Sequence, residues 1–391
     1  MMNRTVKEQS QSGRSPGFRF FLAAILALVA VIRALAAEPP PEARAGAYLE
    51  KSWHSHLAPG TSVVIAFQGR IVFSQAFGFA DLDNLVPATA STVYNMGSIS
   101  KTQTAVAVMQ LVEQGKISLS DPIQKYVPSF PDKGSPITIF HLMTHTSGIR
   151  HYRDDDFPGP YGPYSENMRP YRSLEEAIKI FKDDPLLFRP GEYYSYSSYA
   201  VDLLQGVVEK ASGMGFEDYM RQHVWEPAGM LSTEFDIPER IVPHRAKAYV
   251  MENGRMANAP YGDLTYKFAG GGMISNPEDL VRLGVALNHG TLLRASTLAL
   301  MYQPQLGSVL RYQEQGRGKK LTFEQGLIWK ILKDSGGRRI LYHGGDVKGF
   351  EACMVNYPDQ DFVIADMANG DSIACDELIA VAQFFLDVKP Q

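Results

Sequence analysis

The 391-residue sequence contains only two cysteines, Cys353 and Cys375, and has no excess of basic residues. Two cysteines are too few for a disulfide-stapled scaffold, and no C-x-x-C pair indicates zinc or thioredoxin chemistry. Whether the two cysteines pair stays open. Lys and Arg total 38 against 42 Asp and Glu, a formal net charge of −4, so nucleic acid is not expected as a partner. Stability must therefore come from a hydrophobic core, which a chain of this length can bury.

The first 37 residues have the pattern of a secretory signal. Four basic residues precede an uninterrupted apolar run from Phe20 to Ile32, and small residues follow up to Ala37. A helix over this run would be about 20 Å long, too short for a bilayer core of about 30 Å. We expect residues 1–37 to be a cleaved signal peptide, which makes the protein periplasmic or extracellular. The alternative is an uncleaved membrane tether through residues 20–32.

Strand-like segments lie at both ends of the remaining chain, with helical segments between them. A β-hairpin is expected around Gln68-Gly69-Arg70, with strands at 61–67 and 71–79. Later strands are expected at 326–332, 339–342, 350–356 and 362–367, and a final helix at 372–385. Helices in the middle are expected at 174–182, 200–210 and 277–287.

This order predicts an α+β fold in which one antiparallel sheet is built from both chain ends and flanked by helices. After a linker over residues 38–44, we expect one domain over 45–388. A helical subdomain is expected within about residues 100–320 of that domain.

Ser98 is the candidate nucleophile. It stands three residues before Lys101, at the start of an apolar helix that Gly115 ends. Three-residue spacing on a helix places both side chains on one face. Serine needs a neighbouring base, and a buried lysine at a helix N-terminus has two reasons for a lowered pKa. An S-x-x-K match alone is weak evidence, because Ser98 is equally suited to capping the helix.

Two further segments strengthen the catalytic interpretation. A Pro-Gly turn at 190–191 is followed by a Tyr and Ser cluster, and the strand around Leu341 ends in His343-Gly344-Gly345. Glycines at such a place allow a backbone to approach a substrate closely. The order S-x-x-K, Tyr-Ser-x, strand-H-x-G is a specific constellation.

With these motifs the sequence resembles the serine β-lactamase and penicillin-binding-protein superfamily, in the class C-like branch that includes family VIII esterases and D-aminopeptidases. It is most similar to the mitochondrial serine β-lactamase-like proteins and their bacterial relatives. The segments 141–152 and 267–275 support the resemblance, which spans about residues 45–388.

The resemblance implies a role for each motif residue. Ser98 would be acylated, Lys101 would be its general base, and Tyr196 would relay a proton to the leaving group, with Tyr194 as a poorer candidate. The backbone N–H groups of Ser98 and Asp346 would form the oxyanion hole. His343, in the place of the lysine of Lys-Thr-Gly, would be the fourth catalytic residue, and the positions implied to contact the substrate are Ser198, Gly344 and Gly345.

Two of these positions depart from the family pattern. Ser198 stands where the family usually has Asn, and His343 stands where lactamases have Lys. Since histidine is mostly neutral at pH 7, binding of a substrate carboxylate should be weaker and should improve towards acid pH. No Glu-x-x-Leu-Asn segment offers a class A deacylation base. Both departures argue against an efficient β-lactamase.

Other polar clusters have simpler explanations. His141 and His145 have metal-compatible spacing, but no third ligand follows, so no metal or other cofactor is expected. Asp154-Asp155-Asp156 is expected to be a solvated loop.

The expected function is an exported serine hydrolase acting on peptide, ester or lactam-like substrates through an acyl-enzyme. One alternative is a scaffold of the same fold with low or no activity that forms homo-oligomers. A second is a class C-like β-lactamase or D,D-carboxypeptidase.

Overall fold

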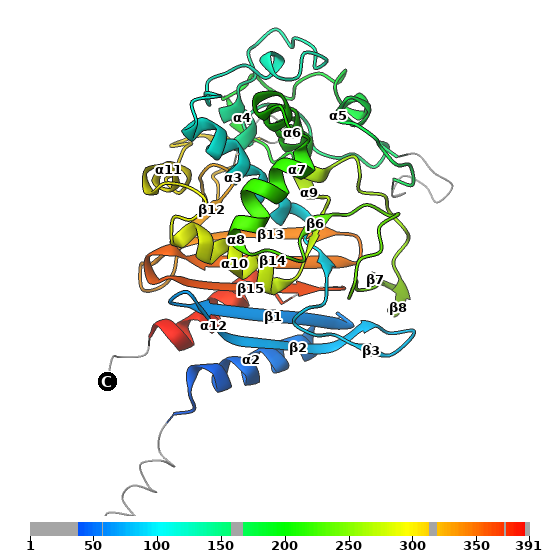
Figure 1. The fold of residues 1–391 in the computed structure, drawn as a ribbon, viewed down its shortest axis with the longest axis vertical. Helices are drawn as coiled ribbons and strands as arrows, with labels where there is room; N and C mark the ends of the chain where they lie inside the picture. The colour runs from blue at the N-terminus through cyan, green and yellow to red at the C-terminus, as the bar shows by residue number, and fades with distance from the viewer. Residues whose placement is uncertain (1–37, 57, 158–166, 313–318, 371–372, 388–391) are drawn as a thin grey trace, which may run out of the picture.

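The computed structural model describes residues 38–387 except 57, 158–166, 313–318 and 371–372 (Figure 1). The predicted signal peptide lies outside this range. Among the described residues, no helix is long and apolar enough to span a bilayer.

An eight-stranded antiparallel sheet forms the centre of the molecule, in the order β11-β12-β13-β14-β15-β1-β2-β3. Its strands are β1 (Gly60–Phe67), β2 (Arg70–Asp81), β3 (Val86–Pro87), β11 (Glu324–Gln325), β12 (Lys330–Lys333), β13 (Arg339–Val347), β14 (Phe350–Tyr357) and β15 (Phe362–Ala368). The first long strand, β1, pairs with the last, β15, along its length, from Thr61 opposite Ala368 to Phe67 opposite Phe362. The prediction of one sheet built from both chain ends is confirmed.

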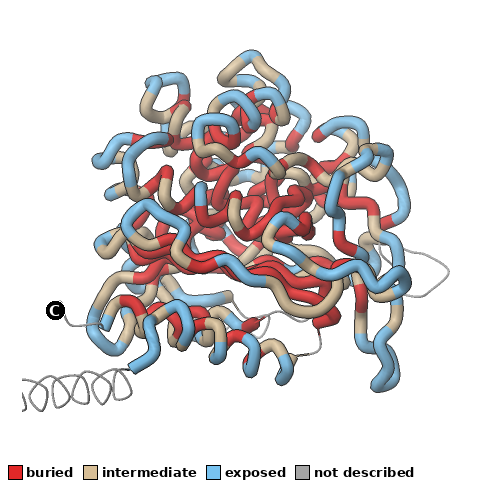
Figure 2. Tube along the Cα trace, turned by 60° about the horizontal axis from the view of Figure 1, so that its bottom comes forward, coloured by how far each residue is buried: buried red, intermediate tan, exposed pale blue. Residues whose placement is uncertain are grey.

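Both faces of this sheet are covered, which explains why its central strands are almost continuously apolar. Along β1, Val64 and Ala66 belong to one hydrophobic core, whereas Val63 and Ile65 belong to the other. The helical block packs on the first face, and α2 (Pro41–Ser55) with α12 (Cys375–Leu386) covers the second (Figure 1). Buried residues accordingly run through the sheet and the middle of the helical block (Figure 2).

The helical block contains most of the remaining elements. Its helices are α3 (Ser100–Glu113), α4 (Ile139–Met143), α5 (Leu174–Ala177), α6 (Ser198–Ser212), α7 (Phe216–Met220), α8 (Glu226–Ala228), α9 (Phe268–Gly271), α10 (Pro277–Asn288) and α11 (Ala295–Met301). Short strands accompany them: β4 (Tyr94–Asn95), β5 (Tyr193–Tyr194), β6 (Glu234–Phe235), β7 (Tyr249–Glu252), β8 (Arg255–Asn258), β9 (Met273–Ser275) and β10 (Leu310–Arg311).

Four local expectations need correction. The strand expected over 326–332 is present only from Lys330, as β12, and residues 326–329 lie between β11 and β12 without strand structure. Helix α2 begins at Pro41, inside the predicted linker, because proline suits the first position of a helix. The helix expected over 174–182 ends at Ala177 and continues only as a 3₁₀ turn. Strand β13 extends to Val347, because its two glycines do not end the pairing with β14.

Cys353 and Cys375 form a disulfide, which settles a question that the sequence left open. Cys353 lies on β14 and Cys375 is the first residue of α12, with their Cα atoms 5.7 Å apart. The bond fastens the C-terminal helix to the sheet.

Candidate active site

Ser98 lies on the turn that leads into a buried helix. It is the middle residue of the 3₁₀ turn η1 (Gly97–Ile99), which continues directly into α3. The residues Ala105–Met109 that follow are buried in the larger hydrophobic core. Burial of this helix fixes the position of the turn that carries Ser98.

Two glycines allow β13 to pack against this turn. A Cβ on Gly97 would lie 2.5 Å from the backbone N of Asp346, and a Cβ on Gly345 would lie 1.9 Å from the backbone O of Met96. Neither contact is sterically allowed, so both positions require glycine. The backbone segments that carry the amides of Ser98 and Asp346 are therefore in direct contact.

Lys101 is completely buried and surrounded by oxygen atoms. Its Nζ donates hydrogen bonds to Ser98 Oγ and Ser198 Oγ, both at 2.8 Å, and to the carbonyl O of Gly270. Burial lowers the pKa of Lys101, and the nearby charge of Asp202 opposes this shift. Lys101 is thus easier to deprotonate than an exposed lysine, and it contacts the hydroxyl of Ser98.

Tyr196 also faces this pair. Lys101 Nζ lies 4.9 Å from the centroid of the Tyr196 ring, and the phenol interacts with the hydroxyl of Ser98. Burial raises the pKa of Tyr196 to about 12, so the phenol is protonated at neutral pH. Tyr194 instead packs its ring against Phe323 and is not among the residues lining the cleft. The geometry therefore favours Tyr196 over Tyr194.

Ser198 contacts the lysine as well as the cleft. It is the first residue of α6 and is 1% exposed, and its hydroxyl accepts the hydrogen bond from Lys101. Its backbone N–H donates to His151 Nδ1 at 3.2 Å. This short side chain is therefore already engaged with Lys101 within the protein.

His343 is a neutral side chain in this site. It is 2% exposed, and its Nδ1 lies 2.6 Å from the carbonyl O of Gly344, so Nδ1 must carry the proton. Its Nε2 is buried and has no hydrogen-bond partner among the described residues. Burial, followed by the charges of Lys330 and Lys101, holds the pKa of His343 well below its usual value. This lowered pKa argues against the expectation that carboxylate binding improves towards acid pH through His343.

A lysine from the neighbouring strand supplies positive charge near His343. Lys330 is the first residue of β12, and its Nζ lies 5.3 Å from the Phe323 ring centroid and 5.4 Å from that of Tyr342. The part of the chain that the structure describes offers Lys330 no carboxylate within ion-pair distance. Sequence reasoning missed this residue, although a lysine directly after the apolar run 327–329 was a visible signal.

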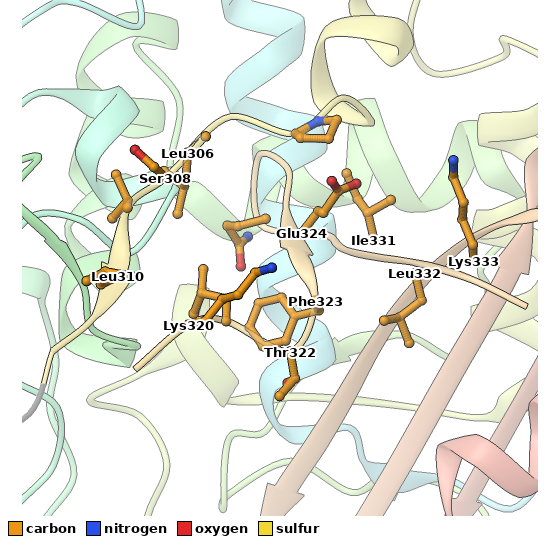
Figure 3. A pocket seen from close by; sticks show the side chains of 15 residues that line it. Leu306, Ser308, Leu310, Lys320, Thr322, Phe323, Glu324, Ile331, Leu332 and Lys333 are labelled. Atoms are coloured by element: carbon orange, nitrogen blue, oxygen red, sulfur yellow. The ribbon is translucent and has the colours of Figure 1, made fainter. Parts of the chain in front are cut away.

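These side chains line one cleft of about 490 Å³. Its walls include Ser98, Tyr196, Ser198, Lys330, the strand residues 343–346 and the disulfide. A larger cavity of about 630 Å³ lies elsewhere, between residues 304–310, 320–325 and β12, with Leu306, Phe323 and Leu332 around it (Figure 3). None of Ser98, Lys101 and Tyr196 lines that cavity, so size alone does not identify the reactive site.

The other polar clusters have structural partners. His141 Nδ1 accepts from the backbone of Thr138 and caps α4, and His145 Nδ1 accepts from the backbone of Ser197. Asp156 is not solvated as expected, because Arg150 binds its carboxylate at 2.7 Å. Within the described ranges, no three His, Cys, Asp or Glu side chains cluster as metal ligands.

Asp202 is the second site residue that the sequence reasoning missed. It lies four residues after Ser198 on α6, 2% exposed, and accepts a 2.7 Å hydrogen bond from the backbone N–H of Gly270. An acidic residue on the apolar face of a predicted helix was the signal that could have identified it.

Comparison with known protein families gives a match over most of the chain. The family model described as Beta-lactamase matches residues 45–383.

The chain belongs to the beta-lactamase family.

Its relatives include the human mitochondrial serine beta-lactamase-like protein LACTB, 30% identical over 388 residues, which cover 78% of this chain and 69% of that protein. Penicillin-binding protein 4* of Bacillus subtilis is 26% identical over 331 residues, covering 80% and 68% of the two chains. The octameric penicillin-binding protein homologue from Pyrococcus abyssi superposes with a TM-score of 0.74 at 26% identity, covering 89% and 78%. As a member of this family, the chain has a hydrolase fold of the serine β-lactamase and penicillin-binding-protein superfamily.

Proposed function

We propose that this protein is an exported serine hydrolase that cleaves peptide amide or ester bonds through an acyl-enzyme. The observation that carries the proposal is the 2.8 Å contact between Ser98 Oγ and the buried Nζ of Lys101. A serine hydroxyl becomes an effective nucleophile when a neighbouring base accepts its proton. Lys101 meets this requirement because burial lowers its pKa.

The protonation state of Lys101 determines which of its three hydrogen bonds it can donate. An ammonium donates to all three oxygens around it, whereas a neutral amine has only two protons and one lone pair. The neutral form can keep its bonds to Ser198 and Gly270 and accept the proton of Ser98. As that proton moves to Lys101, Ser98 Oγ bonds to the substrate carbonyl carbon, and the π electrons of the carbonyl move onto its oxygen.

Tyr196 is placed to complete the acylation step. Its high pKa makes it a donor rather than a base in the resting site. The phenol passes a proton to the leaving nitrogen or oxygen as the scissile bond breaks, and Lys101 restores the phenol proton. The amides of Ser98 and Asp346 hold the oxyanion, and water then hydrolyses the acyl-enzyme.

The cleft also has a feature that bears on substrate choice. The cleft contains two lysines: the charge of Lys330 acts on Tyr196, from which the leaving group would take its proton, whereas Lys267 lies over the rings of Tyr152 and Tyr266. We therefore propose that Lys330 attracts an anionic leaving group. Gly344 leaves room for a substrate backbone beside β13, whereas Gly345 packs against the backbone of Met96 and brings the Asp346 amide close to Ser98.

The disulfide supports export. Disulfides form and persist in oxidising compartments such as the periplasm and the extracellular space, and are rare in the cytosol. Together with the signal-like segment 1–37, the Cys353–Cys375 bond favours a protein that folds outside the cytosol.

Intact-mass labelling of the purified protein with a fluorophosphonate tests the proposal. One adduct is expected on the native chain and none on Ser98→Ala, whereas Ser120→Ala, an exposed serine outside the cleft, should label normally. Absence of an adduct, where a known serine hydrolase labels fully, would overturn the catalytic proposal and favour a scaffold. A penicillin probe and a panel of peptides and esters would then separate peptidase, esterase and lactamase activities.

Self-assembly is a second proposal, since the homologue from Pyrococcus abyssi is described as octameric. Light scattering of the purified protein should then give a mass well above 43.3 kDa. A monomeric mass would contradict it without affecting the catalytic proposal.

A further inference from the structure

Asp202 is an incompletely satisfied carboxylate beside the catalytic pair. It lies on α6 and is 2% exposed. Its Oδ1 accepts the N–H of Gly270 at 2.7 Å, whereas its Oδ2 is buried with no hydrogen-bond partner among the described residues. A buried ionised carboxylate is costly unless hydrogen bonds or an opposite charge compensate it. Burial raises the pKa of Asp202, whereas the charge of Lys101, the Gly270 hydrogen bond and the charge of Lys267 favour its ionised form.

Gly270 joins Asp202 to Lys101. Its N–H is bound by Asp202, and its carbonyl O accepts a hydrogen bond from Lys101 Nζ. A Cβ on Gly270 would lie 2.6 Å from Asp202 Oδ1 and 3.0 Å from the backbone O of Ser198, so a larger residue would push the carboxylate away. Asp202, Gly270 and Lys101 thus form a continuous buried chain that ends at the nucleophile.

We propose that Asp202 is a positioning residue for Lys101, which holds the Gly270 carbonyl in place and supplies the buried negative charge that sets the pH at which Lys101 becomes a base. The inference rests on the proposed function and deepens it, because it names the residue that regulates the same site.

The electrostatics of the pair agree with this arrangement. Burial lowers the pKa of Lys101 and raises that of Asp202, and each charge opposes the shift of the other. Asp202 therefore keeps Lys101 protonated to a higher pH than burial alone would allow. Removing the carboxylate should lower the pKa of Lys101 and leave it neutral, and able to accept the Ser98 proton, at a lower pH.

Other titratable groups face Lys101 but do not replace Asp202. They are His145 and His151 after α4, Tyr152 in the same loop, Tyr196 before α6, Lys267 before α9, Lys330 on β12 and His343 on β13, while Tyr219 and His223 lie towards the far end of α3. Burial lowers the pKa of His145, His151 and His343, which favours their neutral forms. Burial raises the pKa of the phenols of Tyr152, Tyr196 and Tyr219 and lowers that of Lys330. Among the described residues, Asp202 is thus the carboxylate whose charge acts on the pKa of Lys101.

The pH dependence of fluorophosphonate labelling tests the role of Asp202 without knowledge of the substrate. In Asp202→Asn the amide oxygen can still accept the Gly270 N–H, so the main change is loss of the charge. We expect the midpoint of the acid limb of the labelling rate to move down by about one to three pH units relative to the native chain.

Asp279→Asn is the matched control. Asp279 is a buried carboxylate on α10, 4% exposed, whose pKa burial also raises, but it binds Ser232 and Thr233 and does not line the cleft. Its variant should keep the native midpoint. A purely structural role of Asp202 would instead lower the labelling rate equally at every pH with an unchanged midpoint, and this result would overturn the inference.

A failure of the proposed function is a separate outcome. If the native chain shows no Ser98-dependent labelling at any pH, the catalytic proposal fails before Asp202 is tested by rate. NMR titration of the full native chain labelled with ¹³C-lysine then tests whether Asp202 is coupled to Lys101. The same titration is used if Asp202→Asn does not fold. A two-step shift of the Lys101 signal, assigned with Lys101→Arg, supports coupling to Asp202, and a single step contradicts it.

Discussion

Two aspartates are buried on opposite faces of the sheet, and their surroundings differ. Asp366 on β15 has both oxygens bound, one by the hydroxyl of Thr61 and the other by the backbone N–H of Ile373 at 3.0 Å. Asp202 beneath the active site has one oxygen bound and a lysine nearby. Burial raises the pKa of both carboxyls, that of Asp366 to about 7.

The comparison shows that a perturbed pKa does not by itself mark a functional group. Glu351 and Glu377 add to the upward shift of the Asp366 pKa, although Asp366 itself does not line the cleft. The Asp202 carboxyl differs because a hydrogen-bonded chain links it to Ser98. What distinguishes the active side of the sheet is the connection between buried polar groups rather than their number.

The largest expected effect is on the active side. Lys101→Met should reduce the fluorophosphonate labelling rate of Ser98 by about 10²- to 10⁴-fold, since it removes the proposed base for the serine proton. The rate is measured by intact mass over time. Lys210→Met, an exposed lysine on α6, should label as the native chain does; equal labelling of Lys101→Met would show that another group activates Ser98.

The next effect concerns the bond between α12 and the sheet. Replacing both cysteines, Cys353→Ala with Cys375→Ala, frees a loop of 22 residues. The free energy of unfolding should fall by about 3 kcal/mol, because the unfolded chain regains the entropy that the closed loop removes. Urea unfolding of the variant and of the reduced native chain should give similar losses. An unchanged midpoint of urea unfolding would contradict the prediction.

Asp366 should make stability depend on pH. Its folded pKa of about 7 lies above the unfolded value, so the native state binds the extra proton and stability falls as pH rises from about 4 to about 7, by up to about 1.4 kcal/mol per pH unit. Asp366→Asn should remove this contribution and leave the labelling midpoint of Ser98 unchanged. Urea unfolding at several pH values measures it, and an identical pH dependence in the two proteins would contradict the assignment.

The smallest expected effect concerns the cation at the cleft. Lys330→Gln should reduce the preference for an ester whose leaving group bears a carboxylate, over its neutral analogue, by about tenfold. The ratio of the two kcat/KM values measures this preference. Lys333→Gln, at the exposed end of the same strand, should leave the ratio unchanged; if Lys330→Gln does so too, Lys330 is not the anion contact.

Much of the fold was predictable because its signals are local. The hairpin turn at Gln68 and Gly69, both with positive φ, follows from the glycine between two apolar runs. The Ser98 and Lys101 pair was predictable because three-residue spacing on a helix is a fixed geometry. Tyr196 was identified by a resemblance, and its proximity to Ser98 arises from tertiary packing.

The remaining site residues depend on contacts between distant segments. The positions of Asp202 and Gly270 relative to Lys101 follow from the packing of α6 and α9 on α3, which no local pattern encodes. The protonation of His343 depends on the carbonyl of Gly344 and on burial between strands and helices. The cysteine pair likewise depends on how α12 crosses β14.

The pairing of β1 with β15 also governs the order in which the molecule can fold. These central strands are about 300 residues apart, so the sheet cannot close until the C-terminal strand has been synthesised and has left the ribosome. A contact between such distant segments forms slowly, because the entropy cost of closing the long loop between them must be met before the strands pair. An incomplete chain therefore lacks the middle of its sheet, so neither hydrophobic core can be completed before β15 is available.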